Sequence, residues 1–456
     1  MTFLHRRLIY PGVARALGEG AMFRRLGELS QLQYKPREHL ESYQAQRLGR
    51  LLSRATHTPY YRTWLDARQV SRTSDPHALL QSLPVLSKRD LQGSFAQLQA
   101  VPRPSRVSVK VTGGSTGQAV TIMKDRAATA FERAAMWLGY GWHGVAIGDR
   151  AARFWGQPFG QRARFLTGLT DLAMNRIRFS AFAFDDESLE KYWSACQRFR
   201  PQYFHGYVSM LVEFAQFVLA TGKDGLGLRL KSIIATSEVL MPAHRTLLES
   251  VFGCPVQVEY GCGEMGPIAY GCEKGTLHLL TPDLYVEFLR DDNTPAGIGE
   301  TARLVLTDLN NQAMHLLRYD IGDYGIAGTS CDCGRGLPTL EKIWGRAYDV
   351  VVAPDGKKFH GEFFMYIVED IRRANLSVSQ FQVVQVTPQS LVFRVIANPQ
   401  VHPQIAQRLH KVIEEHMPGM AIQLEWVGNI PRLPSGKIQI IENRCIRSAL
   451  HASSLS

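Results

Sequence analysis

The sequence predicts a mixed α/β protein with a large N-terminal domain and a smaller α+β domain at its C-terminal end. Between residues 200 and 310, helical stretches such as PAHRTLLESVF alternate with short apolar runs such as KSIIATSE, VQVEYG, YVEFL and RLVLTDL. This alternation is typical of strands layered with helices. The chain has 456 residues, which is more than a single ordinary domain needs.

The C-terminal part has a different pattern, and we place a domain boundary near Gly345. The runs FQVVQV and LVFRVIA flank TPQS, which predicts a hairpin. The strand-like run AIQLEWV then follows a predicted helix whose apolar face is formed by Ile405, Leu409, Val412, Ile413 and Met417. The predicted domains are residues 1–345 and 346–456.

Two helices are predicted in the N-terminal part. Residues 36–62 carry apolar side chains at helical spacing up to a proline, and residues 126–140 have the same periodicity. Together with the alternating segments that follow, they complete the expected α/β layers.

Composition excludes several classes of protein. The chain is 45% hydrophobic and 20% charged, as expected of a globular protein, and it has no run of eighteen apolar residues. Its net charge is +11, but lysine and arginine are dispersed, so we expect no nucleic-acid partner. Seven cysteines are few for a disulfide-built protein, and the basic N-terminal stretch lacks a signal-peptide pattern, so we expect a cytoplasmic protein. The composition does not indicate an oligomeric state.

The segment VTGGSTGQAV, residues 111–120, is a loop of the kind that binds phosphate. It is not a nucleotide-binding P-loop, because Gln118 follows Gly117 where that motif requires lysine. Backbone N–H groups, with the hydroxyls of Thr112, Ser115 and Thr116, would still suit phosphate oxygens. Taken alone, such a segment is more often an ordinary glycine-rich turn.

Four later motifs supply the other groups that an ATP site needs: YGCGEMG, LLRYDIGDYG, GRAYDVV and RLPSGKIQ. Tyr260 would stack on adenine and Glu264 would hold Mg²⁺. Asp323 would accept hydrogen bonds from the ribose hydroxyls, and Lys437 would place a cation near a developing negative charge. Taken singly, each would more often be a packing or surface residue, so only their order along the chain carries the hypothesis.

That order resembles the adenylate-forming superfamily, and within it the phenylacetate–CoA ligase-like branch that includes CapK-like proteins of capsule-polysaccharide loci. The resemblance runs nearly from end to end, over LLSRATHTPYYRTWL, LQSLPVLSKRDL, TSEVLMP and PAGIGETARLVLTDLNNQAMHLLRYDIGD. It implies that ATP activates a carboxylic acid as an acyl-adenylate, with release of pyrophosphate, and that the acyl group then passes to a thiol, usually CoA. The resemblance also implies the ATP-binding residues Thr112, Gly113, Gly114, Ser115, Thr116, Gly117, Ser237, Glu238, Tyr260, Asp323 and Arg346, with Glu264 on Mg²⁺ and Lys437 as the catalytic lysine.

The chain departs from the family pattern in three places. Gln118 and Ala119 replace the lysine or glutamate and the proline that are frequent after the glycine-rich loop, which puts phosphate affinity in doubt. Asp320 stands at the usual arginine position of the ribose motif, and we still assign ribose binding to Asp323. Residues 349–362 match the interdomain hinge only loosely.

Four residues form a second candidate site. Three thiolates and one imidazole suit tetrahedral zinc with no open coordination position, and the set is Cys272, His278, Cys331 and Cys333. The resemblance supports structural zinc here, since some related ligases hold one at a similar place. The alternative is a group of ordinary thiols and a surface histidine.

Aromatic segments of the larger domain are candidates for the acyl pocket. By position, ARFWGQPFG and PQYFHGYVSM would bring Trp155, Phe159, His205 and Tyr207 to the acid, with Cys262 and Gly263 as further wall residues. Taken singly, each of these aromatics is more often a core residue than a substrate contact. The motifs do not identify the acid or distinguish CoA from a carrier-protein thiol or an amine as acceptor. A catalytically silent scaffold with the same fold is the alternative of another class.

Overall fold

The computed structural model describes residues 4–66, 70, 75–112, 120–155, 161–180, 186–346, 350–360, 363–364, 367–368, 370–371, 374–376, 378–431 and 439–445. The side chains of 111–112, 161–166, 344–346, 350, 358 and 360 are left out of the description. The chain forms two compact units. The larger holds the described residues up to Ile343 except Gly322–Tyr324, and the smaller holds those three and the described residues from Trp344 onward. Of the helices in these ranges, none has the length and hydropathy needed to span a membrane.

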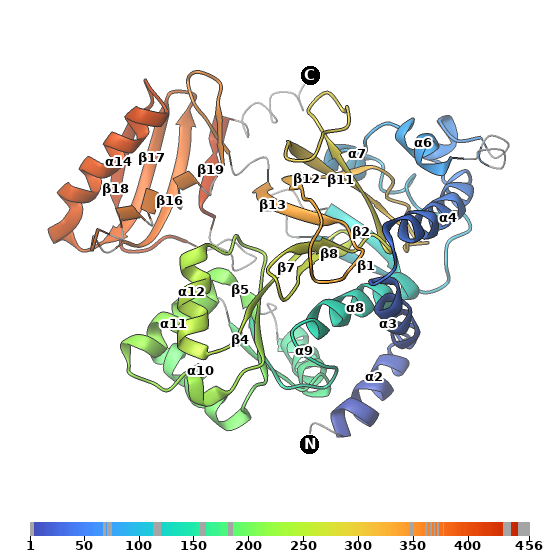
Figure 1. Cartoon of the computed structure of the whole chain (residues 1–456), viewed down its shortest axis with the longest axis horizontal. Coiled ribbons are helices and arrows are strands. Elements are labelled where there is room, and N and C mark those ends of the chain that lie inside the picture. Colours follow the sequence, from blue (N-terminus) through green and yellow to red (C-terminus); the bar gives the residue numbers. More distant parts are fainter. Residues whose placement is uncertain are drawn as a thin grey trace. The chain divides into compact units, whose positions relative to one another are not determined.

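The larger unit is built on one mixed sheet, in which eleven described strands lie in the order β10-β11-β12-β13-β9-β8-β7-β6-β5-β3-β4 (Figure 1). Five neighbouring strands, from β4 to β7, run parallel, and β7 pairs antiparallel with β8, which pairs antiparallel with β9. The strands are β3 (Ala151–Trp155), β4 (Arg176–Ser180), β5 (Tyr203–Tyr207), β6 (Ser232–Thr236), β7 (Val256–Cys262), β8 (Gly266–Gly271), β9 (Leu277–Leu279), β10 (Leu284–Leu289), β11 (Thr301–Asp308), β12 (Tyr319–Ala327) and β13 (Thr339–Arg346).

Helices cover both faces of the parallel strands, which explains why β5 and β6 are buried along their whole length. Helices α10, α11 and α12 cover one face (Figure 1). Phe154 and Phe204 pack with side chains of these helices. On the other face, Tyr203 and Ile234 pack with α8, and Gly139 lets that helix approach the Tyr270 ring, because an added Cβ would lie 2.3 Å from it. The helices are α2 (Tyr10–Ala16), α3 (Ala21–Leu32), α4 (Arg37–Ala55), α6 (Pro76–Gln81), α7 (Lys88–Gly93), α8 (Arg126–Gly141), α9 (Gln161–Ala173), α10 (Asp186–Phe199), α11 (Val208–Ala220) and α12 (Pro242–Phe252).

A separate hairpin, β1 (Val107–Thr112) and β2 (Val120–Asp125), flanks the glycine-rich segment. Thr112 pairs with Val120, and the seven residues between them lie outside the described residues. Asp125 ends β2 and begins α8, since its carboxylate accepts the Ala128 backbone N–H at 2.9 Å. The hairpin therefore joins the candidate phosphate loop directly to a helix that packs on the main sheet.

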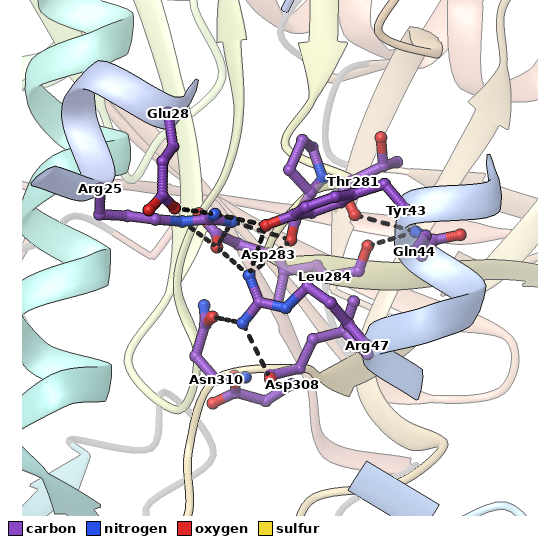
Figure 2. A network of polar contacts seen from close by, with 12 residues as sticks. Arg25, Glu28, Tyr43, Gln44, Arg47, Thr281, Asp283, Leu284, Asp308 and Asn310 are labelled. Atoms are coloured by element: carbon purple, nitrogen blue, oxygen red, sulfur yellow. Dashed lines mark hydrogen bonds and ion pairs between the residues drawn. The ribbon is translucent and has the colours of Figure 1, made fainter. Parts of the chain in front are cut away.

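The N-terminal helices α3 and α4 are held by a buried polar network (Figure 2). Arg25, which is 1% exposed, donates to Asp283 Oδ1 from Nη2 at 2.6 Å and from Nε at 3.2 Å. It also donates to Tyr43 Oη at 2.7 Å and to the Pro282 carbonyl at 3.0 Å. Arg47 lies 3.5 Å from the same Asp283 carboxylate. This Arg25 network connects two helices to the segment between β9 and β10.

The smaller unit has a four-stranded sheet, in the order β18-β17-β16-β19, and α14 packs against it (Figure 1). The predicted hairpin is confirmed, because β16 and β17 are antiparallel and Thr387 pairs with Ser390. The predicted apolar helix face is also confirmed, since Ile405, Leu409 and Ile413 are buried in the core of this unit. The elements are β14 (Val350–Val352), β15 (Lys358–His360), β16 (Val378–Thr387), β17 (Ser390–Ala397), α14 (His402–His416), β18 (Ala421–Trp426) and β19 (Ile441–Asn443).

The predicted elements of the larger unit are present, with one difference in extent. The helix expected over 126–140 is α8, and the strands expected between 230 and 310 are β6, β7, β10 and β11. The helix expected over 36–62 ends earlier, at Ala55. Pro59 explains this, because proline disfavours the helical conformation in the residue before it. The mixed α/β fold with a small α+β C-terminal part is thereby confirmed.

Candidate functional site

Several of the predicted site residues lie at one edge of the main sheet. The parallel strands β3, β5 and β6 end at Trp155, Tyr207 and Thr236, and β7 carries Tyr260 near its end. Ligands of α/β proteins bind at the carboxyl ends of parallel strands, because the connecting loops meet there. The topology therefore brings the predicted adenine and acyl residues of the larger unit to the same edge.

The turn between β7 and β8 carries the predicted metal ligand, Glu264. Glu264 is buried, and the preceding Tyr260 is partly buried against the core of the larger unit. The Cys262 thiol accepts the Met265 backbone N–H at 3.4 Å, which fixes the turn. Gly266 has φ +81°, and an added Cβ would lie 2.8 Å from the Glu132 side chain. The turn thus packs closely against α8 and holds the carboxylate of Glu264 in a confined place.

A buried lysine on β2 faces this turn, and sequence reasoning did not single it out. Lys124 is fully buried and forms an ion pair with Glu132 of α8. Burial lowers the pKa of Lys124, whereas the carboxylates of Asp308 and Glu264 act in the opposite direction. The available signal was a lysine inside the apolar strand VTIMKD, directly after the glycine-rich loop. A cation beside Glu264 suits a site that handles anions.

The residues predicted beside adenine follow β6 directly. Ser237 has φ +69°, a left-handed conformation that turns the chain sharply at the strand end. Glu238 accepts the backbone N–H of Ser209 at 2.6 Å and its hydroxyl at 3.1 Å. Since Ser209 lies in the first turn of α11, this carboxylate also complements the positive end of the helix dipole. The segment after β6 is therefore anchored to a helix of the same unit.

The aromatic residues proposed for the acyl pocket form one cluster. The Trp155 ring lies 4.5 Å from that of Tyr207 and stacks on His205 at 5.3 Å, measured between ring centroids. His205 Nε2 lies 3.5 Å from Glu259 Oε1. His205 is therefore a buried histidine with an acidic partner, and its ring supports that of Trp155. Phe159 lies outside the described residues.

Glu259 is a buried carboxylate that sequence reasoning also missed. The Tyr270 hydroxyl donates to its Oε2 at 3.0 Å. Burial raises the pKa of Glu259, but His205 and the tyrosine hydroxyls outweigh burial and hold the pKa at about 2. Glu259 is therefore ionised at neutral pH, behind the aromatic cluster. Its neighbours belong to different strands, so no local pattern predicts this arrangement.

The remaining predicted residues are only partly described. Asp323 lies on β12 and is largely buried, in the segment that groups with the smaller unit. Asp320 forms an ion pair with Arg303 at 2.5 Å. Arg346 ends β13, but its side chain is not described. Gly113, Gly114, Ser115, Thr116, Gly117 and Lys437 lie outside the described residues.

The four predicted zinc ligands come together at one place. Cys272 follows β8, His278 lies on β9, and Cys331 and Cys333 lie between β12 and β13. Their ligand atoms all lie within 4.8 Å of one another. Two pairs are closer: Cys272 Sγ is 3.8 Å from Cys331 Sγ, and Cys333 Sγ is 3.2 Å from His278 Nε2.

These distances fit a tetrahedral metal site. Zinc–sulfur bonds of about 2.3 Å at tetrahedral angles separate two sulfur atoms by roughly 3.8 Å. His278 Nδ1 lies 3.1 Å from the Leu337 carbonyl, which would accept its proton and leave Nε2 free to bind the metal. His278 and Cys272 are buried, whereas both other cysteines are partly exposed. The group therefore suits a closed structural zinc site, as its residue types predicted.

Comparisons with known proteins agree with this fold. Residues 351–444 match the family described as the CapK C-terminal domain. Protein CapK of Staphylococcus aureus is 23% identical over 383 residues, which cover 79% of this chain and 79% of that protein. A phenylacetate-coenzyme A ligase of Thermus thermophilus is 26% identical over 339 residues, 71% of this chain and 74% of that protein.

A solved structure extends the likeness to nearly the whole chain. The crystal structure of 2-hydroxyisobutyryl-CoA ligase, in its postadenylation state with an acyl-adenylate, has a TM-score of 0.71 and 19% identity to this chain. The match covers 93% of this chain and 94% of that one. The fold and the matched relatives are those of the adenylate-forming superfamily. Within that superfamily, the sequence similarity is to phenylacetate–CoA ligases and to CapK, and residues 351–444 match the CapK C-terminal domain.

Proposed function

We propose that this protein uses ATP to activate a carboxylic acid as an acyl-adenylate and then transfers the acyl group to CoA. The observation that carries the proposal is the edge of the main sheet, where Tyr260, Glu264 and the Trp155 aromatic cluster lie at the ends of successive strands. Relatives named phenylacetate-coenzyme A ligase support the same chemistry. The acid itself is not specified by these residues.

In the first half-reaction, the acid's carboxylate attacks the α-phosphorus of ATP and displaces pyrophosphate. Both reactants are anions, so the site must lower their repulsion. Mg²⁺, held by Glu264 and the nucleotide phosphates, would neutralise charge on the leaving group. Lys124 is already buried beside Glu264, and it adds a fixed positive charge on the same side of the turn.

The other residues would position the nucleotide. Tyr260 would stack on the adenine ring, with the segment Ser237–Glu238 at its edge, and Asp323 would accept the ribose hydroxyls. Arg346 would support the nucleotide. Lys437 would bridge the carboxylate and the α-phosphate, and a cation placed in advance stabilises charge that develops in the transition state.

In the second half-reaction, the CoA thiol attacks the acyl carbonyl and AMP leaves. We propose that the smaller unit, which carries Lys437, moves between the two half-reactions so that the thiol has access. Such domain motions commonly complete a site and exclude water. A carrier-protein thiol or an amine as acceptor is the alternative that the same adenylation step permits.

We also propose that Cys272, His278, Cys331 and Cys333 hold a structural zinc. The ion would connect the segment after β8 with the segment between β12 and β13. With all four positions filled by protein ligands, it would bind no substrate and would act through stability alone.

The test is hydroxylamine-trapped adenylation over a broad panel of carboxylic acids, with and without CoA. We expect one class of acid to give hydroxamate and, with CoA, to release AMP at an increased rate. If CoA does not increase AMP release, the acceptor would instead be a carrier-protein thiol or an amine. Failure of every acid to form hydroxamate would favour a silent scaffold.

A further inference from the structure

One arginine beside the aromatic cluster has no counter-ion among the described residues. Arg153 lies on β3, two residues before Trp155, and its guanidinium stacks over the Trp155 ring at 4.2 Å from the centroid. Within the described chain, no acceptor is within hydrogen-bonding distance of its buried Nε, and no carboxylate forms an ion pair with it. A buried cation without a partner is costly, and proteins rarely retain one without a reason.

The acids near Arg153 are already occupied by other groups. Asp171 accepts Arg176 Nε at 2.6 Å and Arg178 Nε at 3.0 Å. Glu259 accepts the Tyr270 hydroxyl and lies 3.5 Å from His205. Neither carboxylate lies within ion-pair distance of Arg153, so the arginine has no direct counter-ion in the described part of the larger unit.

The local charge balance favours an anion. Arg178 on the neighbouring strand β4 is the register partner of Arg153. Arg176 lies two residues before Arg178 and so on the same face of β4. Arg176 and Arg178 share the single carboxylate of Asp171, so this pair carries one excess positive charge beside Arg153. Burial is the largest cause that lowers the pKa of Arg153, and the positive charges of Arg176 and Arg178 lower it further. Tyr140 and Glu259 act in the opposite direction. An incoming anion would relieve this repulsion.

We infer that Arg153 binds a second carboxylate at the far end of the substrate, so that the enzyme activates dicarboxylic acids. This inference rests on the proposed function and names the substrate class of the same site. The guanidinium lies at the sheet edge where Trp155 and Tyr207 were predicted to contact the acid. Stacking on Trp155 fixes the guanidinium plane, and a planar fork of donors matches a carboxylate in two parallel hydrogen bonds.

The experiment measures binding by the full chain, with α,β-methylene-ATP present so that no turnover occurs. Two matched pairs of probes differ only in the second carboxylate: terephthalate with 4-methylbenzoate, and glutarate with pentanoate. We expect at least one dicarboxylate to bind about 10- to 100-fold more tightly than its partner, the range of a hydrogen bond to a charged group. Calorimetry gives both dissociation constants.

Three variants separate the role of the charge from that of packing. Arg153→Met keeps the contact with Trp155 and should abolish the preference, whereas Arg153→Lys keeps the charge without the fork and should retain part of it. Arg198→Met removes an exposed arginine of α10 and should leave the preference unchanged. Unfolding temperatures without ligand show whether each variant folds.

Two results would overturn the inference: wild-type protein that binds no dicarboxylate more tightly than its partner, or an Arg153→Met variant that keeps the full preference. Adenylation of monocarboxylic acids in the panel would then leave the proposed function standing. Conversely, a preference that depends on Arg153, in a protein that adenylates no acid, would support this anion site and remove the proposed function.

Discussion

Replacing Arg25 with methionine tests the buried network that connects the N-terminal helices to the main sheet. Methionine fills similar space but carries no donor, so the change removes the ion pair to Asp283 and the hydrogen bonds to Tyr43 and Pro282 (Figure 2). Asp283 is 4% exposed and would remain buried. The question is how much stability the larger unit loses.

The structure sets the magnitude. Breaking a buried ion pair by removing one partner typically costs about 3–5 kcal/mol, because the other charge stays buried without compensation. Arg47 still lies 3.5 Å from the Asp283 carboxylate and would compensate part of that charge. We therefore expect Arg25→Met to lower the free energy of unfolding by about 3 kcal/mol, at the lower end of that range.

Glu28 provides a matched control on the same arginine. It contacts Arg25 Nη1 at 3.0 Å, but its side chain is 47% exposed. Exposed ion pairs contribute about 0–1 kcal/mol, so Glu28→Gln should have little effect. The difference in burial thus predicts that loss of the ion pair to Asp283 lowers the free energy of unfolding much more than loss of the ion pair to Glu28.

Urea unfolding followed by tryptophan fluorescence measures both variants, and Asp283→Asn completes a double-mutant cycle. Asp283→Asn should cost less in the Arg25→Met background than in wild type, with a coupling energy of about 2 kcal/mol. If Arg25→Met and Glu28→Gln were equally mild, or if the cycle showed no coupling, burial would not control this network and the reasoning would be wrong.

Three further predictions concern pH, metal and catalysis. Burial lowers the pKa of His315 from its ordinary 6.5 to about 4. The unfolded chain therefore binds this proton more tightly, and stability should fall as the pH drops below about 6.5, by roughly 2–3 kcal/mol at pH 4.5. Urea titrations at pH 7 and 4.5 should show a smaller loss for His315→Gln, and an equal loss would exclude His315 as the cause. Protein purified without chelator should contain one zinc per chain by mass spectrometry. Cys331→Ser should lower that content while Cys254→Ala, a buried thiol elsewhere, keeps it; metal-free wild-type protein would remove the zinc proposal. Finally, Lys437→Ala should reduce ATP–pyrophosphate exchange by about 10²–10³ while ATP binding and transfer from a supplied acyl-adenylate persist. Near-normal exchange would contradict the role of Lys437, and equal loss of both half-reactions would contradict the domain motion.

Local patterns in the sequence predicted the elements of this fold. Apolar residues at helical spacing placed α8 and the buried face of α14, and short apolar runs placed β6, β7, β10 and β11. These predictions succeeded because each depends on side chains that are neighbours in the sequence and share one face of one element. The order of motifs also sufficed to identify the superfamily, since it needs no knowledge of distances.

Contacts between distant residues were decided only by the tertiary structure. Arg25 contacts Asp283, which lies 258 positions away in the sequence. Glu259 on β7 lies near His205 on β5 because only one strand, β6, lies between them in the sheet. Arg153 faces Arg178 only because β4 becomes the neighbour of β3. Such contacts follow from strand order and register, which no periodicity within a segment encodes. The residue types of the zinc set were visible in the sequence, but their convergence within 4.8 Å required the fold.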